Sequence, residues 1–414
     1  MRRKLILHVG PHKTGTTYIQ KYLYLNRHIL LKHGWDYPRP IELNPNVDHY
    51  GHIKLGFDES QILYYLSNSK SENIIFSSEN LYILDENKMH KLFEAIIDAE
   101  FEKIIIVIFV RNPIDRIYSN IKELIKEGWT YTIPEFLSIY LLNPIVRPET
   151  NYTIFLDKIK KIISENVEII IVDYEYFSKT SLLTPLIEIM KIPVNNLILK
   201  DEFVNKSLEI EFVEILRFLN AKCKEFGVDP HGYKVFSTVR EFLKFDNEFK
   251  EIIEKLQNAM VAYKEIMTIG SFIPSALENI LVKKYSNAFY KNIHTSWDKF
   301  IQIEFISQEW LLNKKLLDTL DILFQKIVTS LKKKPNEIKI QSIIENDLRK
   351  IVYIKIDFIE SLFTVQVSST DILITYLPDN QEWNLLCIAP KDTTSIPLVI
   401  KYLDGSEEKI EVKI

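Results

Sequence analysis

An apolar run, a glycine-flanked turn and a helical pattern follow one another near the start of the chain. Residues 5–9 are almost continuously apolar, as expected of a buried parallel strand. Gly10 and Gly15 flank the turn that follows, in a chain that has only 10 glycines among 414 residues. From Ile19 to Leu30 the apolar residues recur at helical spacing. The sequence therefore predicts a strand, a tight turn and a helix in succession, which is typical of an α/β fold.

A turn of this kind can hold a phosphate group, because its backbone N–H groups and the positive end of the helix converge on an anion. Lys13 would supply a full positive charge, and Thr16 and Thr17 would add hydroxyl donors in the first helical turn. The Walker A loop of nucleotide triphosphatases has its lysine directly after the second glycine. Here Lys13 precedes Gly15 by two residues. An ordinary strand-to-helix turn is the alternative interpretation.

A second apolar strand is expected over residues 73–78, and Glu79 follows at its C-terminal end. In open α/β sheets, ligands bind outside the carboxyl ends of the strands. Glu79 is therefore expected to lie close to the chemistry of the protein.

The most apolar strand is expected over residues 103–110, and its continuous apolar run suits a parallel strand covered on both faces. Arg111 follows this strand, and Ser119 lies two turns into the helix that comes next. A guanidinium fork and a hydroxyl can hold one phosphate from two sides. Asp115 and Arg116, on the same helix, are expected to make helix-surface ion pairs.

The rest of the chain suggests a division into three parts. A fourth strand is expected over residues 168–175, helical stretches continue to about residue 330, and short strands follow Pro335. Asp404-Gly405 is a strong hairpin signal. The expected parts are a three-layer, P-loop-like α/β domain with a central parallel sheet over residues 1–300, a helical connector and linker over 301–335, and a small antiparallel, β-sandwich-like accessory domain over 336–414.

Charge, cysteine content and apolar segments indicate which partners and which compartment to expect. The net charge of −4 and the pI of about 6.2 do not suggest nucleic acid or an anionic membrane as the main partner. The two cysteines, Cys223 and Cys387, show no metal-ligand spacing and no disulfide framework. No apolar segment approaches the length of a membrane span, and the residues after Met1 lack a secretory leader pattern. We therefore expect a cytoplasmic protein, and the sequence does not predict its oligomeric state.

Two histidines lie in an irregular, proline-rich region over residues 35–52. His49 and His52 are three positions apart and could contact an acceptor, act as a base or pair with surface carboxylates. Without a third ligand, such a pair is weak support for a metal. No metal site is predicted.

Two motifs resemble the sulfotransferases that use 3′-phosphoadenosine 5′-phosphosulfate (PAPS). The pattern G-x-x-K-T-G-T-T over residues 10–17 resembles their 5′-phosphosulfate loop. Arg111, followed eight residues later by Ser119, resembles their 3′-phosphate site. The resemblance covers roughly residues 4–300 and extends to bacterial sulfotransferase domains. The glycine-rich C-terminal nucleotide segment of the cytosolic small-molecule branch is missing.

The resemblance implies a transferase that moves a sulfuryl group from PAPS to a hydroxyl or amine. The acceptor would be a small molecule or a glycan, and carbohydrate sulfation is favoured over a phenol. PAPS would be the co-substrate, and no metal is required. Lys13 would stabilise charge on the oxygen that bridges sulfate and phosphate, while Arg111 and Ser119 would hold the 3′-phosphate. The 5′-phosphate would be held by Gly10, Pro11, His12, Lys13, Thr14, Gly15, Thr16 and Thr17.

The catalytic base and the class of protein each have alternatives. Glu79 is the first candidate for the base that takes the acceptor proton, and His49 or His52 is the second. Glu79 could instead only bind substrate. A P-loop kinase would need ATP, magnesium and a Walker A lysine, and the placement of Lys13 and Arg111 disfavours it. A non-catalytic nucleotide-binding scaffold protein is the third possibility.

Overall fold

The computed structural model describes most of the chain, and the chain divides into two compact units. Unit 1 comprises residues 1–121, 134–207 and 267–303, and unit 2 comprises residues 122–133, 208–266 and 304–414. The domain boundaries expected at residues 300 and 335 stay a prediction. The described residues are 3–414 apart from 42–49, 53–54, 56–58, 163–166, 194–196, 198–207, 227–229, 232–233, 332–336, 346–348, 358–362, 368, 370–371, 380–381 and 403–406.

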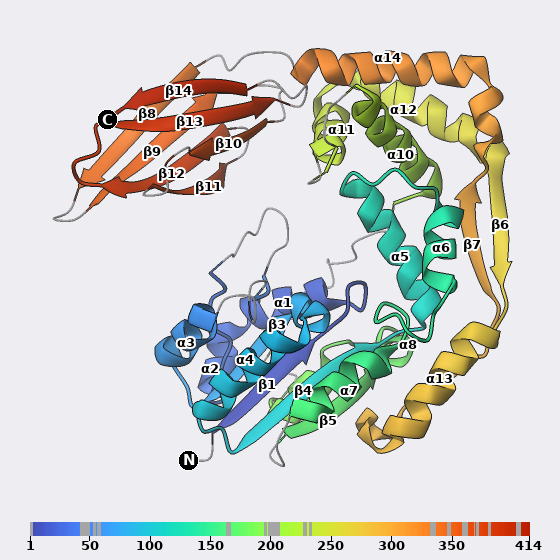
Figure 1. Cartoon of the computed structure of the whole chain (residues 1–414), viewed down its shortest axis with the longest axis vertical. Coiled ribbons are helices and arrows are strands. Elements are labelled where there is room, and N and C mark those ends of the chain that lie inside the picture. The colour runs from blue at the N-terminus through green and yellow to red at the C-terminus, as the bar shows by residue number, and fades with distance from the viewer. Residues whose placement is uncertain are drawn as a thin grey trace. The chain divides into compact units, whose positions relative to one another are not determined.

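Unit 1 is built on a five-stranded sheet with strand order β2-β3-β1-β4-β5 (Figure 1). All neighbouring strands in this sheet are parallel. The prediction of an α/β fold with a central parallel sheet is therefore confirmed. The strands are β1 (Lys4–Val9), β2 (Trp35–Asp36), β3 (Asn73–Ser78), β4 (Lys103–Val110) and β5 (Val167–Asp173).

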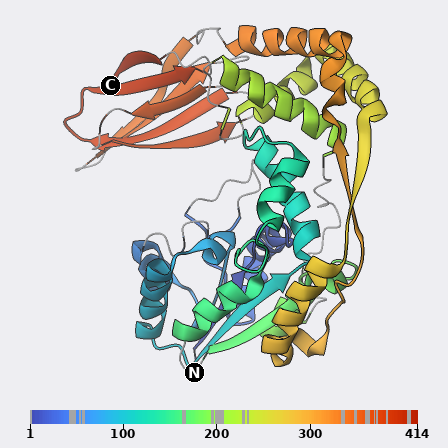
Figure 2. The ribbon, with the colours of Figure 1, turned by 45° about the vertical axis from the view of Figure 1, so that its right-hand side comes forward.

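Helices cover both faces of the sheet because side chains along each strand alternate between two cores. Leu5 and Leu7 of β1 pack in one core with α4, α7 and α13, whereas Ile6 packs in the other with α1 and α9. Figure 2 shows α7 and α13 beside the same part of the sheet. The helices of unit 1 are α1 (Thr16–Leu25), α2 (Arg27–Lys32), α3 (Glu59–Asn68), α4 (Glu86–Asp98), α5 (Pro113–Lys126, which continues into unit 2), α6 (Ile133–Leu141), α7 (Tyr152–Ile162), α8 (Tyr174–Phe177), α9 (Thr184–Met190) and α13 (Phe272–Tyr285).

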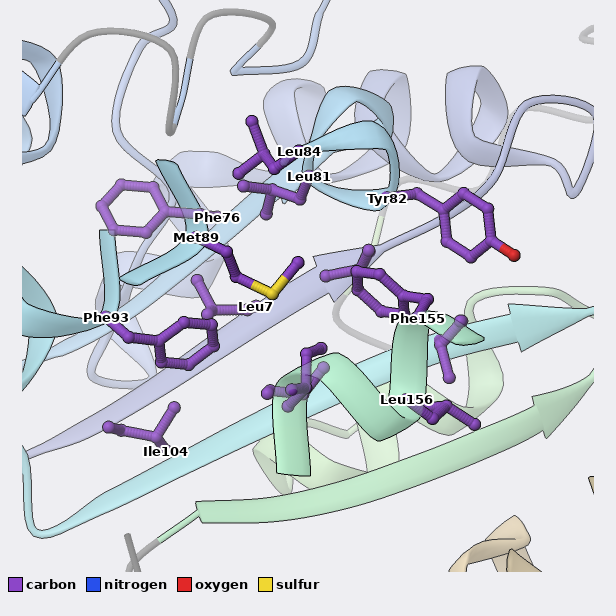
Figure 3. Packing of buried hydrophobic residues seen from close by; sticks show 14 of the residues in the cluster. Leu7, Phe76, Leu81, Tyr82, Leu84, Met89, Phe93, Ile104, Phe155 and Leu156 are labelled. Carbon is purple, nitrogen blue, oxygen red and sulfur yellow. The ribbon is translucent and has the colours of Figure 1, made fainter. Parts of the chain in front are cut away.

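The first core joins the sheet to α4 and α7. Figure 3 shows Leu7 of β1 and Phe76 of β3 near Met89 and Phe93 of α4, with Phe155 of α7 in the same cluster. Each of these side chains is at most 3% exposed. Burying a side chain of this size contributes roughly 1.5–3 kcal/mol, so this core fixes the strands firmly beneath the loops at their ends.

The carboxyl ends of the strands meet at one edge of the sheet. Val9 of β1 is paired with Ser78 of β3 on one side and with Ile108 of β4 on the other. The chain runs from β1 to the β2–β3 side and then crosses to β4, so the strand order changes direction between β1 and β4. Such a switch point is where open α/β sheets bind ligands.

Unit 2 combines helices with antiparallel sheets. The Arg217 guanidinium lies 2.7 Å from the Glu214 carboxylate in the helical part, and Trp310 Nε1 donates to the same carboxylate at 2.9 Å. The C-terminal strands form a three-stranded sheet, β10-β13-β14, and a four-stranded sheet, β11-β12-β9-β8. Antiparallel strands were expected here, and their sandwich-like arrangement stays a prediction. The helices are α10 (Ile210–Glu225), α11 (Lys234–Phe245), α12 (Asn247–Met260) and α14 (Lys314–Leu331), and the strands are β8 (Glu337–Glu345), β9 (Arg349–Asp357), β10 (Phe363–Val367), β11 (Leu373–Asp379), β12 (Glu382–Pro390), β13 (Ser395–Tyr402) and β14 (Glu407–Lys413).

Three local expectations differ from the structure. The fourth strand ends at Asp173 rather than at residue 175, because the Asp173 carboxylate accepts from Tyr176 N at 2.7 Å and starts α8. The region expected to be helical up to residue 330 contains a two-stranded sheet, β6 (Lys264–Ile269) and β7 (Ile301–Ile306). At the start of β7, buried residues alternate with exposed ones. This alternation has the period of two that is typical of a strand and not of a helix. In the C-terminal part, the first strand expected from the sequence covers residues 351–357, and β8 precedes it.

Candidate functional site

The loop between β1 and α1 has an unusual backbone. Lys13 has a φ of 70° and Gly15 a φ of 81°, so both residues adopt the left-handed conformation. Thr14 Oγ1 donates to the Pro11 carbonyl at 2.8 Å and closes the turn. Among the described residues no side chain caps the start of α1, and its first turn contains no acidic residue. The N–H groups of that turn and the helix dipole are therefore suited to an anion.

Both glycines of the loop are required by its packing. A Cβ on Gly10 would collide with the Thr16 methyl group and press on Thr14 Oγ1. A Cβ on Gly15 would collide with Leu182, and the left-handed backbone disfavours any side chain there. The scarcity of glycine in the sequence thus corresponds to two positions where the fold leaves no room for a side chain.

Glu79 lies beside this loop, as its place at the end of β3 predicted. It begins a 3₁₀ turn over Glu79–Ile83 directly after the strand. Thr16 Oγ1 donates a short hydrogen bond to Glu79 Oε1, and His12 Nδ1 forms a short ion pair with Glu79 Oε2. The exposed fraction of the side chain is 48% for His12 and 20% for Glu79. Both oxygens of the carboxylate are thus engaged by residues of the loop.

The surroundings of Glu79 and His12 shift the pKa of both residues. Burial by itself would raise the pKa of Glu79, but the contact with His12 and the hydrogen bond from Thr16 outweigh it, so the pKa is lowered. Burial by itself would lower the pKa of His12, but the hydrogen bond to Glu79 and its negative charge raise it. The positive charge of Lys13 adds to the lowering of the Glu79 pKa and opposes the rise of the His12 pKa. Lys13 therefore lies within electrostatic reach of the pair.

Arg111 joins the end of β4 to the loop. Its Nη1 donates to the Lys13 carbonyl at 3.2 Å, and its guanidinium carbon lies 5.1 Å from the centre of the Tyr174 ring. Arg111 Nε and Glu175 Oε1 are 3.8 Å apart, and neither of these buried atoms has a hydrogen-bond partner in the described part of the chain. Tyr152 holds the backbone of Arg111 by donating to its carbonyl at 2.8 Å. A fixed guanidinium with an unsatisfied buried donor is suited to an anionic oxygen.

The other predicted residues of the two motifs have less defined surroundings. Thr17 lies half-buried in the first turn of α1, and Ser119 lies half-buried two turns along α5. That Ser119 and Arg111 hold one phosphate together stays a prediction.

Of the two histidines of the irregular region, the structure describes only His52. His49 lies outside the described residues. His52 is fully buried, its Nδ1 accepts from Ser77 N at 3.3 Å, and its Nε2 donates to the Pro38 carbonyl at 3.0 Å. Burial lowers the pKa of His52 to about 4. With both ring nitrogens bonded to backbone, His52 supports the fold beneath the loop rather than meeting an acceptor.

The helix-surface role expected for Arg116 is wrong. Arg116 is only 5% exposed. Its Nη2 donates to the Glu149 carbonyl, and its guanidinium carbon lies 5.5 Å from the centre of the Tyr152 ring. Asp115 does form a surface ion pair, with Lys299 at 3.4 Å. Arg116 has the long aliphatic stem and planar head that allow burial against aromatic rings.

A polar layer at the C-terminal end of β5 was not found from the sequence. His294 Nε2 lies 2.6 Å from Glu278 Oε1, and its Nδ1 lies 3.5 Å from Asp173 Oδ2. Asp173 also accepts from Thr295 N at 2.6 Å. This layer holds the segment around residue 294 against the end of β5, next to Tyr174. No local pattern links residues so distant in the chain.

Within the described ranges, no group of three or more His, Cys, Asp or Glu side chains is arranged to hold a metal ion, and no helix has the length and apolar character to cross a membrane. Cys223 and Cys387 are free, buried thiols, and burial raises the pKa of each to about 11.

Comparisons with known proteins give only remote likenesses. No protein-family model and no curated protein matches the chain. The crystal structure of mouse sulfotransferase SULT7A1 complexed with PAP is similar at a TM-score of 0.27 and 17% identity, over 54% of this chain and 68% of that one. The crystal structure of m157 from mouse cytomegalovirus is similar at a TM-score of 0.18 and 12% identity, over 27% of this chain and 48% of that one. Likenesses at this level carry no functional conclusion.

The packing of Gly10 gives a testable expectation. Gly10→Ala should lower the free energy of unfolding by about 1–3 kcal/mol, because the new methyl group displaces Thr16 from its place beside Glu79. Urea denaturation measures this change. Gly270→Ala is the matched control, since a Cβ there would meet nothing within 4 Å. Equal stability of the two variants would contradict the packing described here.

His294 should make stability depend on pH. Burial lowers its pKa, but the hydrogen bonds and charges of Asp173 and Glu278 outweigh this, so the pKa is raised from 6.5. The stabilisation from protonated His294 is therefore fully present below pH 6.5 and is lost as the pH rises through the raised pKa. The urea midpoint of the wild type should fall over that interval more steeply than that of His294→Gln. Parallel pH dependences of the two proteins would exclude this role.

Proposed function

We propose that the protein is a PAPS-dependent sulfotransferase that transfers a sulfuryl group to a hydroxyl or amine. The hydrogen bond from Arg111 Nη1 to the Lys13 carbonyl, at 3.2 Å, is the observation that carries the proposal. It brings the two segments that resemble the 5′- and 3′-phosphate sites of these enzymes together at the switch point of the sheet. A nucleotide with phosphates at both ends of its ribose needs two such anion sites at once.

In this proposal the loop and Arg111 bind different ends of the donor. The 5′-phosphate would take the backbone N–H groups after Gly15, including that of Thr16, together with the hydroxyl group of Thr17. The Thr16 hydroxyl hydrogen is donated to Glu79 and would stay there. The 3′-phosphate would take the donors of Arg111, whose Nε is unsatisfied, and the hydroxyl of Ser119. Selection of a 3′-phosphorylated nucleotide over ADP or ATP would follow from this second site.

Sulfuryl transfer places simple demands on the protein. The acceptor oxygen or nitrogen bonds to sulfur while the bond from sulfur to the bridging oxygen breaks, and that oxygen leaves with the phosphate. Much as in phosphoryl transfer, the protein has mainly to position the reactants and neutralise charge. Lys13 would stabilise the charge that develops on the bridging oxygen. A carbohydrate acceptor is part of the proposal, on the basis of the missing small-molecule segment and the β-rich C-terminal part.

Calorimetric titration with 3′-phosphoadenosine 5′-phosphate (PAP), the product of the donor, tests the donor site. Wild-type protein should bind PAP more tightly than ADP or ATP with magnesium. Arg111→Ala should weaken PAP binding about 10- to 150-fold, the equivalent of a charge-assisted hydrogen bond worth roughly 1.5–3 kcal/mol, and should weaken ADP binding less, because ADP has no 3′-phosphate.

Two further variants sharpen this titration. Arg111→Lys keeps the charge but loses the planar fork, so its affinity for PAP should lie between those of the wild type and Arg111→Ala. Arg27→Ala, on the exposed surface of α2, is the control for loss of an arginine elsewhere in the unit. Binding of ATP with magnesium as tight as that of PAP would exclude the sulfotransferase and favour a kinase.

A further inference from the structure

The carboxylate that is the first candidate for the catalytic base is already engaged. Glu79 Oε1 accepts from Thr16 Oγ1, and Glu79 Oε2 is paired with His12 Nδ1. These two contacts stabilise the ionised form of Glu79 and lower its pKa, which makes Glu79 a weak base for the acceptor proton. A carboxylate held in this way is instead placed to orient the imidazole, as the third group of a nucleophile–base–orienter arrangement does.

We propose that His12, oriented by Glu79, is the group that takes the acceptor proton. The inference rests on the proposed function and assigns a new role to a residue that was expected only to help hold phosphate. His12 contacts Glu79 through Nδ1, so the other ring nitrogen, Nε2, is directed away from the carboxylate. The His12 side chain is 48% exposed and that of Glu79 20%, so the imidazole is the more accessible member of the pair.

The position of His12 in the loop suits this role. It directly precedes Lys13, which is expected to neutralise the leaving oxygen, so the base and the cation would flank the transferring group. Glu79 in contact with His12 stabilises the imidazolium that forms when His12 accepts the proton. Thr16 fixes the other oxygen of Glu79 and so limits rotation of the carboxylate. The two other charges that act on His12 are those of Lys13 and Arg116, and both oppose its protonation.

The proposed step is balanced as follows. The acceptor oxygen forms a bond to sulfur as the bond between sulfur and the bridging oxygen breaks, with both electrons of the broken bond remaining on PAP. The acceptor proton passes to Nε2 of His12, and the imidazolium later loses it to water. His12 must therefore be neutral at the start, and turnover should rise with pH as His12 loses its proton.

The pairing itself can be tested without nucleotide or acceptor. The ring protons of His12, followed by NMR in the full chain, should titrate with a midpoint above 6.5 in the wild type, because Glu79 favours the charged form. In Glu79→Gln the midpoint should move to lower pH. His28→Asn, on the exposed surface of α2, identifies the signal of a histidine that does not contact Glu79. An unchanged midpoint in Glu79→Gln would overturn the pairing.

The role in turnover is tested with PAPS, by measuring PAP release in the presence of water and of a panel of oligosaccharides. His12→Asn keeps an N–H donor toward Glu79 and removes Nε2. Its affinity for PAP should be within a few-fold of that of the wild type. Its turnover should be roughly 10²–10⁴-fold lower, and that turnover should no longer rise with pH. Glu79→Gln should lose less turnover than His12→Asn, and its turnover should rise with pH at a lower pH than that of the wild type. His28→Asn should behave as the wild type.

The outcomes separate this inference from the proposed function. Absence of PAP binding by the wild type would exclude the sulfotransferase, and the base role with it, while the NMR titration would still report on the pairing. PAP binding and turnover that remain pH-dependent in His12→Asn would overturn the base role alone. A larger loss of turnover in Glu79→Gln than in His12→Asn would return the role of base to Glu79.

Discussion

The hydrogen bond between the Arg111 guanidinium and the Lys13 carbonyl is the constraint on which the site depends. It joins the end of β4 to the loop after β1, two segments that lie about a hundred residues apart in the chain and side by side in the sheet. The bond is possible because β1 and β4 are neighbours in parallel register and end at the same edge. The two layers of helices hold that register by burying alternate side chains of each strand. The cores therefore determine where the charges of the site stand.

Local patterns were sufficient for the framework of the site. The strands before Gly10, Glu79 and Arg111 could be predicted because each is a short apolar run that ends in a polar residue, and the sheet then places those ends together. The tight turn between Gly10 and Gly15 was predicted from the two glycines, and the structure adds that the backbone at Gly15 is left-handed. β6 and β7 could not be predicted in the same way, because short alternating stretches within a helical region give a weak signal.

Contacts between residues that are far apart in the chain could not be predicted from the sequence. Glu79 was expected near the chemistry, yet its contact with His12 depends on the path of the loop, which no spacing rule gives. Arg116 and His52 are polar residues whose burial depends on the rings of Tyr152 and Phe76 packed around them. The layer formed by Asp173, His294 and Glu278 combines residues more than a hundred positions apart. In each case the tertiary environment, and not residue type, decides the role.

The loop after β1 is tethered from both sides. Glu79, at the end of β3, holds Thr16 and His12, while Arg111, at the end of β4, holds the Lys13 carbonyl. The conformational entropy of ordering these residues is therefore lost during folding and not when a ligand arrives. An anion bound as proposed would meet a loop that is already ordered, so most of the interaction free energy of its contacts would be expressed as affinity. Preorganisation of this kind also favours fast association, because no slow rearrangement of the loop has to precede binding.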